Sequence, residues 1–316
     1  MTDGNGTGLS GQVSIADEVE ELKRRRNAVV LAHYYVPGEV QDLADHVGDS
    51  FYLAKLACTL DADVIVLAGV AFMGESAKLL NPERTVLLPE PAADCPMAHM
   101  ASVAEVAKVR REHPGVAVAC YVNSTAELKA ASDVCVTSSN AARIVSGLAA
   151  DEVYFIPDMN LGRYVAEKVP EKHVILNQGW CPRHVGISPE EVRSLAREHP
   201  GAPVLAHPEC TPEVLDEADF VGSTSQIIEQ ARESDARELI ILTVVGVAHE
   251  LERACAGQGK RFLFPGHPPI CPNMASVTPE KVRDCLRDMS GAVEVDAACA
   301  PAARRALERM LELAGR

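Results

Sequence analysis

The chain has 316 residues, of which 47% are hydrophobic and 24% are charged. This composition is ordinary for a folded globular protein and excludes the weakly hydrophobic, disordered class. The formal net charge of −15 at pH 7 argues against a nucleic-acid partner, because affinity for a phosphate backbone comes from clusters of lysine and arginine.

The N-terminal segment and the longest apolar run indicate where the protein resides. Residues 1–12 are polar and glycine-rich, and they lack the basic start and the apolar stretch of a signal peptide, so we expect a flexible tail there. The apolar run from Val64 to Met73 is too short to span a bilayer. We therefore expect a cytoplasmic protein without a membrane segment, whose ten cysteines stay reduced.

From residue 16 onward, amphipathic stretches alternate with short apolar runs, a pattern typical of a parallel sheet with crossover helices. A helix predicted over residues 16–26 leads into a strand over 28–35. Similar pairs of helix and strand recur over 102–123 and over 188–209. A last helix is predicted over 302–313.

Polar residues follow these first strands at matching positions. Two triplets recur at intervals of 88 and 86 residues: His33, Tyr121 and His207, and Tyr35, Asn123 and Glu209. The repeat predicts an α/β protein of three homologous parallel-sheet units. We set their boundaries at 13–98, 99–186 and 187–299, and assign the closing helix, residues 300–316, to the first unit.

Hydroxyl side chains mark the end of the second strand in each unit. Ser50, Ser138 and Thr224 repeat the same two intervals, each where a strand gives way to a helix. This is a natural N-cap or anion-binding position. The three hydroxyls are therefore expected to bind substrate, and plain helix caps are the alternative.

Three of the ten cysteines follow the C-terminal end of a fourth strand at the similar intervals of 86 and 90 residues, namely Cys95, Cys181 and Cys271. Ligands of open parallel sheets collect beyond these strand ends. Three units around a pseudo-threefold axis would direct all such residues to one point. The regular alternation found in any βαβ protein explains the order of the elements, but it does not explain why polar and thiol residues recur at equal or nearly equal intervals.

Three thiolates suit a 4Fe-4S cluster with one iron free to act as a Lewis acid, and no CxxC pair of the kind common in structural zinc sites is present. His184 would be the fourth ligand if the metal were zinc. An open iron beside acid-base groups favours dehydration chemistry. The available acid-base groups are His33, Tyr35, Tyr121, His207 and Glu209.

Several strings resemble those of the quinolinate synthase family, iron-sulfur enzymes of NAD biosynthesis, from about residue 20 to 290. They are AHYYVPGEVQDLADHVGDS, FMGESAKLLNPE, CYVNSTAELKA, CVTSSNA, FIPDMNLGRYVA, HPEC, VGSTSQII and CPNM. The resemblance implies condensation of iminoaspartate with dihydroxyacetone phosphate to quinolinate, with loss of phosphate and water. It also implies a supply of iminoaspartate from an aspartate oxidase or dehydrogenase, and a cluster held by Cys95, Cys181 and Cys271.

The family's motifs assign roles to further residues. They imply catalysis by His33, Tyr35, Tyr121 and Glu209, in which Glu209 shuttles protons and the tyrosines polarise or protonate oxygens. They imply substrate binding by His33, Ser50, Tyr121, Asn123, Ser138, His184, His207, Glu209 and Thr224.

Three positions depart from the family pattern. The segment from Thr243 to Gly246 lacks the usual carboxylate, Gln226 replaces a glycine, and Asn177 replaces a tryptophan. Another 4Fe-4S-dependent hydro-lyase, or a relative with an altered small-carboxylate substrate, is the main alternative. Two further interpretations of the sequence are a metal-binding regulator and a metal-free structural protein.

Overall fold

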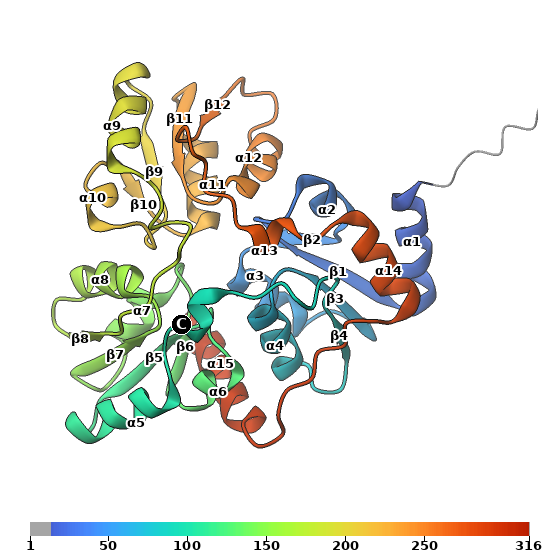
Figure 1. The fold of residues 1–316 in the computed structure, drawn as a ribbon, viewed down its shortest axis with the longest axis horizontal. Coiled ribbons are helices and arrows are strands. Elements are labelled where there is room, and N and C mark those ends of the chain that lie inside the picture. The colour runs from blue at the N-terminus through green and yellow to red at the C-terminus, as the bar shows by residue number, and fades with distance from the viewer. Residues whose placement is uncertain (1–13, 316) are drawn as a thin grey trace, which may run out of the picture.

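The computed structural model describes residues 14–315, so the tail expected over 1–12 lies outside the described residues. The described chain forms three four-stranded parallel sheets with helices packed around them (Figure 1). In spatial order the sheets are β2 (His46–Gly48), β1 (Ala28–His33), β3 (Val64–Ala68) and β4 (Thr85–Leu87); β6 (Val134–Val136), β5 (Ala117–Tyr121), β7 (Glu152–Ile156) and β8 (His173–Leu176); and β10 (Phe220–Val221), β9 (Val204–Ala206), β11 (Glu238–Leu242) and β12 (Arg261–Leu263). The expected α/β class with three parallel-sheet units is therefore confirmed.

Helices connect the strands and extend the chain beyond the last sheet. Their bounds are α1 (Ile15–Arg26), α2 (Gly38–Leu43), α3 (Ser50–Ala57), α4 (Ala71–Leu80), α5 (Val103–Glu112), α6 (Ala126–Ala130), α7 (Ala141–Ser146), α8 (Met159–Lys168), α9 (Pro189–Glu198), α10 (Pro212–Leu215), α11 (Thr224–Glu233), α12 (Ala248–Ala254), α13 (Pro272–Ala275), α14 (Pro279–Asp288) and α15 (Ala300–Ala314), with 3-10 turns η1 (Pro96–His99) and η2 (Val245–Val247). The helices predicted over 16–26 and 302–313 are confirmed as α1 and α15. Among residues 14–315, no helix is both long and apolar enough to cross a bilayer.

The helix before each unit's first strand begins and ends in the same way. Serine side chains cap the N-termini of α1, α5 and α9, where a hydroxyl accepts a free backbone N–H. A residue with positive φ follows each helix, and these residues are Asn27, Gly115 and Gly201. Asparagine and glycine adopt this left-handed conformation at low cost, so the chain can turn sharply into the strand.

One aspartate in each unit holds the second strand beside the first. The carboxylates of Asp45, Asp133 and Asp219 accept hydrogen bonds from the backbone N–H groups of Val30, Val118 and Val204, at 2.7, 2.7 and 2.8 Å. The three aspartates are themselves 88 and 86 residues apart. The sequence repeat is therefore a repeat of hydrogen bonds as well as of elements.

The apolar core divides the molecule unequally. One continuous cluster of buried side chains runs through the first two sheets and includes residues of α14 and α15. Two separate clusters belong to the third sheet, and Tyr34 and Tyr35 of the first unit pack against one of them. The first and second sheets are thus joined by shared hydrophobic burial, whereas the third has its own core.

The last two helices return to the first two units. Helix α14 lies within the boundary expected for the third unit, 187–299, yet it packs against α1, α2 and β3. Helix α15 packs against α4 on one side and against α6 and β6 on the other, as the red helix of Figure 1 shows. The C-terminus therefore fastens the first two units together.

Candidate active site

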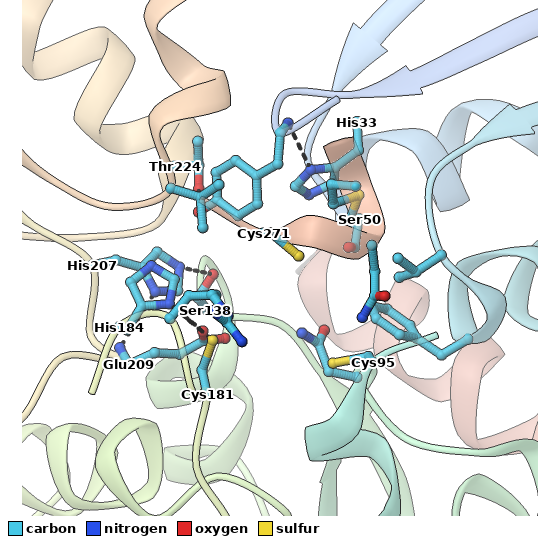
Figure 2. Close-up of a pocket in the computed structure, with 18 of the residues that line it drawn as sticks. His33, Ser50, Cys95, Ser138, Cys181, His184, His207, Glu209, Thr224 and Cys271 are labelled. Atoms are coloured by element: carbon cyan, nitrogen blue, oxygen red, sulfur yellow. Dashed lines mark hydrogen bonds and ion pairs between the residues drawn. The ribbon is translucent and has the colours of Figure 1, made fainter. Parts of the chain in front are cut away.

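A cavity lies where the C-terminal ends of strands from all three sheets meet (Figure 2). It encloses about 880 Å³ of empty space, part of it open to solvent. Every site residue predicted from the sequence lines this cavity: His33, Tyr35, Ser50, Cys95, Tyr121, Asn123, Ser138, Cys181, His184, His207, Glu209, Thr224 and Cys271. The structure thus brings together residues that the sequence spreads over three units.

The three cysteines reach the cavity through the same local structure. A proline follows each of them, and each carbonyl accepts the N–H that closes a helical turn, at 2.9, 3.1 and 2.9 Å for Cys95, Cys181 and Cys271. Their sulfur atoms point into the cavity in Figure 2. All ten cysteines lie within the described residues, and all are free thiols.

Their surroundings oppose ionisation of two of these thiols. Burial, and then the charge of Glu209, raises the pKa of Cys95 to about 12. The same two causes raise the pKa of Cys181 well above its usual value. The three free thiols line one cavity, and a bound cation would favour their ionisation, so the donor set fits a thiolate-ligated metal centre.

Two imidazoles at the ends of first strands are held in one tautomer. Nδ1 of His33 accepts the backbone N–H of Tyr35 at 3.1 Å, and Nδ1 of His207 accepts that of Glu209 at 3.3 Å. Burial lowers the pKa of His33 to about 4 and that of His207 to about 3, although Glu209 opposes this shift. Each ring is therefore neutral at pH 7 with its proton on Nε2, ready to donate a hydrogen bond.

A buried carboxylate links the second and third units. Tyr121 donates its hydroxyl to Oε1 of Glu209 at 2.7 Å, while Oε2 lies 2.7 Å from Nδ1 of His184. Burial opposes the charge on Glu209, but His184, His207 and Tyr121 outweigh it and hold the pKa of this carboxyl below its usual value. The carboxylate is thus charged at neutral pH.

The zinc alternative has partial geometric support. Cys181, His184 and Glu209 each offer a ligand atom, and these atoms lie within 4.8 Å of one another. Nδ1 of His184 is 3.2 Å from the Cys181 sulfur. Because Cys95 and Cys271 do not belong to this group, a zinc ion there would leave two of the three cavity thiols without a role.

Thr243 lies within hydrogen-bonding distance of two predicted site residues, although the sequence did not identify it as a site residue itself. Its hydroxyl lies 2.6 Å from the hydroxyl of Tyr35 and 2.9 Å from Nε2 of His184. The Tyr35 hydroxyl also lies 2.6 Å from Oγ1 of Thr224. The only sequence signal at Thr243 is that it begins the segment that lacks the family carboxylate. In that segment, Val244 is buried and lines the cavity.

Asp158 is a second buried carboxyl near the site that the sequence did not single out. It caps α8 by accepting the N–H of Leu161 at 2.8 Å, and its Oδ2 has no hydrogen-bond partner among residues 14–315. Burial, and then the charge of Glu209, raises its pKa well above the usual value. Its place within the string FIPDMNLGRYVA was the one available signal.

The hydroxyl residues are not N-caps, so the alternative that they are plain helix caps is wrong. Asp49, Asn140 and Ser223 occupy the cap positions of α3, α7 and α11. A capping side chain already stands immediately before Ser50 and Thr224, so these two fall at the first helical position. Their hydroxyls are therefore not required for capping and remain available at the cavity wall.

Two departures from the family pattern have local explanations. Gln226 forms a capping box with Ser223, since its Oε1 accepts the Ser223 N–H at 2.8 Å. Asn177 is buried, donates to the carbonyls of Met100 and Pro157 at 3.0 and 2.7 Å, and accepts from the Tyr154 hydroxyl at 3.0 Å. Both side chains thus form hydrogen bonds, and neither lines the cavity.

The size of the cavity admits a small molecule, and its walls bring proton donors and acceptors to bear on that molecule from three sides. The fold and site therefore define an enzyme with a small-molecule substrate. A family model described as "Quinolinate synthetase A protein" matches residues 17–312, and the chain belongs to this family.

Curated relatives extend over almost the whole chain. A quinolinate synthase of Alkaliphilus metalliredigens is 46% identical over 302 residues, which cover 96% of this chain and 99% of the relative. One from Fusobacterium nucleatum is 47% identical, covering 95% and 99%. One from Aquifex aeolicus is 44% identical, covering 94% and 93%.

Replacing Thr243 by valine should lower the free energy of unfolding by about 1–3 kcal/mol, because the isosteric change removes one hydrogen-bond partner from the buried His184 and one from the half-buried Tyr35. Thr243→Ser keeps the hydroxyl and serves as the matched control. Urea unfolding of the metal-free protein measures both variants. Equal stability of Thr243→Val and the unmodified protein would contradict the role of Thr243 as a connector.

Proposed function

We propose that this chain condenses iminoaspartate with dihydroxyacetone phosphate to quinolinate, with loss of phosphate and water. The observation that carries the proposal is the convergence of three free thiols, two neutral imidazoles and the Tyr121–Glu209 pair in one cavity. Relatives that cover this chain almost completely bear the name quinolinate synthase, which supports the same reaction. An aspartate oxidase or dehydrogenase would supply the iminoaspartate.

Cys95, Cys181 and Cys271 would hold a 4Fe-4S cluster, since all three are free thiols that face one cavity. When bound, the cluster would supply a Lewis acid through the iron that has no protein ligand. His184, beside Cys181 and Glu209, would then orient these groups from Nδ1 and remain anchored to Thr243 through Nε2.

Substrate binding would rely on neutral donors rather than on a basic pocket. The Nε2–H groups of His33 and His207 would donate to carboxylate oxygens of the bound molecule. The hydroxyls of Ser50, Ser138 and Thr224 and the amide of Asn123 would complete the binding surface. Neutral donors limit the desolvation cost of binding, because they bring no second charge into a buried site.

Proton transfer would run through the hydrogen-bonded groups at the cavity wall. Glu209 is the charged carboxylate that lies against Tyr121 and His184 at the cavity wall, and it would accept a proton released as the substrates condense. Burial holds the pKa of Tyr121 and of Tyr35 well above its usual value, so both hydroxyls remain protonated and can donate to oxygens of the substrate. Tyr121 is already in contact with Glu209, which gives the proton a direct path between them.

We further propose that the three units are arranged around a pseudo-threefold axis that passes through the cavity, which their common strand order supports. We propose the same boundaries for the three units, 13–98, 99–186 and 187–299. Because α14 and α15 pack on the first two units, the C-terminal part of the chain from α14 onward would move with those units.

The deciding experiment measures iron, acid-labile sulfide and quinolinate formation on protein purified without oxygen. We expect about four iron and four sulfide atoms per chain, as a 4Fe-4S cluster requires, and quinolinate with stoichiometric phosphate release. Iron-loaded protein that releases no phosphate from dihydroxyacetone phosphate would instead favour a different hydro-lyase. Protein that takes up no iron on anaerobic reconstitution would refute the cluster.

A further inference from the structure

One permanent cation lines the cavity and takes no part in the chemistry described above. Among the residues that form the wall, all within the described range, Arg183 is the only lysine or arginine. Its side chain is exposed, so it stands at the rim rather than in the interior. No residue of the described chain forms a hydrogen bond or an ion pair with its guanidinium.

The position of Arg183 is fixed although its guanidinium is free. Its backbone N–H points at the Cys181 thiol, and the Cys181 carbonyl accepts the N–H of Val185 at 3.1 Å. The next residue, His184, is fully buried and tied to Glu209 and Thr243. The main chain that carries Arg183 is therefore anchored on both sides, and this exposed residue forms part of the cavity wall.

The carboxylates of the same wall are already engaged elsewhere. Asp49 caps α3 and accepts the hydroxyl of Ser225, Asp94 pairs with His99 at 2.6 Å, and Glu209 is bound by His184 and Tyr121. None of them neutralises Arg183. In a chain with a net charge of −15, an unpaired cation at a cavity mouth is the feature that would attract an anion.

We propose that Arg183 binds the phosphate of the triose phosphate substrate at the rim of the cavity. This inference rests on the proposed function. A planar guanidinium matches two oxygens of a phosphate at once, and a dianion gains more from a fixed cation than a single carboxylate does. The phosphate must also leave during the reaction, and the solvent-exposed rim gives it a direct exit, whereas the buried imidazoles and Glu209 suit the part of the substrate that is retained.

The test compares cluster-loaded wild-type protein with Arg183→Gln under anaerobic conditions. At saturating iminoaspartate, we expect the KM for dihydroxyacetone phosphate to rise on the order of ten- to a hundredfold while kcat changes by less than about twofold, because the lost contact is one charge-assisted hydrogen-bond pair. The inhibition constant of inorganic phosphate should rise by a similar factor, and Arg183→Lys should recover part of both effects.

Arg305→Gln is the matched control, since it makes the same change in net charge at an exposed position on α15 that does not line the cavity. It should leave both constants unchanged. An unchanged KM for dihydroxyacetone phosphate in Arg183→Gln would overturn the proposal, as would a rise confined to the KM for iminoaspartate, or a loss of iron.

A direct binding measurement separates this inference from the proposed function. Calorimetric titration of inorganic phosphate into the cluster-loaded wild-type protein and Arg183→Gln needs no turnover. Weaker phosphate binding in the variant supports the role of Arg183 even if no quinolinate is formed by the wild-type protein. Equal phosphate binding in the two proteins refutes it even if quinolinate is formed.

Discussion

Replacing any one of Cys95, Cys181 and Cys271 by serine should reduce cluster iron to near zero and quinolinate formation to below about one per cent of wild type. The three sulfurs face one cavity from three units, so no second thiol stands ready to replace a lost ligand at the same place. Iron and sulfide analysis after anaerobic reconstitution, with an electron paramagnetic resonance spectrum of the reduced protein, measures the loss.

Two other cysteines provide matched controls for this experiment. Cys58 is exposed, and Cys285 is buried within α14 with its thiol 3.1 Å from the carbonyl of Ser290. Neither lines the cavity, so Cys58→Ser and Cys285→Ser should retain iron and activity. Full iron content in any of the three cavity variants would refute the assignment of that cysteine as a ligand.

Replacing Glu209 by glutamine should lower kcat by about 10²–10⁴-fold, the range that a positioned acid-base group contributes. The substitution preserves volume and one oxygen for the Tyr121 hydroxyl, but it removes the charge that accepts a proton. Iron content should remain that of wild type, because the three thiols are untouched. Steady-state quinolinate formation and iron analysis on the same preparation separate loss of catalysis from loss of the cluster.

Glu213 offers the comparison for this substitution, since it is an exposed carboxylate four residues farther along the chain. Glu213→Gln should leave kcat unchanged. If Glu209→Gln retained wild-type kcat, the proton would have to pass through another group, and Asp158, buried with an unpartnered oxygen, would be the residue to test next.

The site could be predicted from sequence wherever its residues repeat. His33 and His207 occupy the same position in two units, so a comparison of intervals was enough to find them, and the cysteines recur at the similar intervals of 86 and 90 residues. The fixed offset works because each unit presents equivalent strand ends, and a cavity beyond those ends collects whatever the repeat places there.

Other features depend on how the units dock, and sequence intervals carry no information about docking. Thr243 contacts Tyr35 across 208 residues and His184 across 59, and neither contact follows from a repeat. The return of α14 to the first unit was missed for the same reason. The N-cap of α3 is Asp49 and not the neighbouring Ser50. Both residue types can cap a helix, so the sequence pattern alone does not choose between them.

The division of the apolar core determines which of the three units can separate from the others at the lowest cost in free energy. Parting the first two units would expose a continuous hydrophobic interior and pull α15 from both. The side-chain bonds from the third unit across the cavity are largely polar, among them Tyr121 with Glu209 and His207 with Ser138. Water can replace such bonds at small net cost. We therefore expect the third unit to part from the other two at a lower cost in free energy than the first two units part from each other, and this separation would open the cavity.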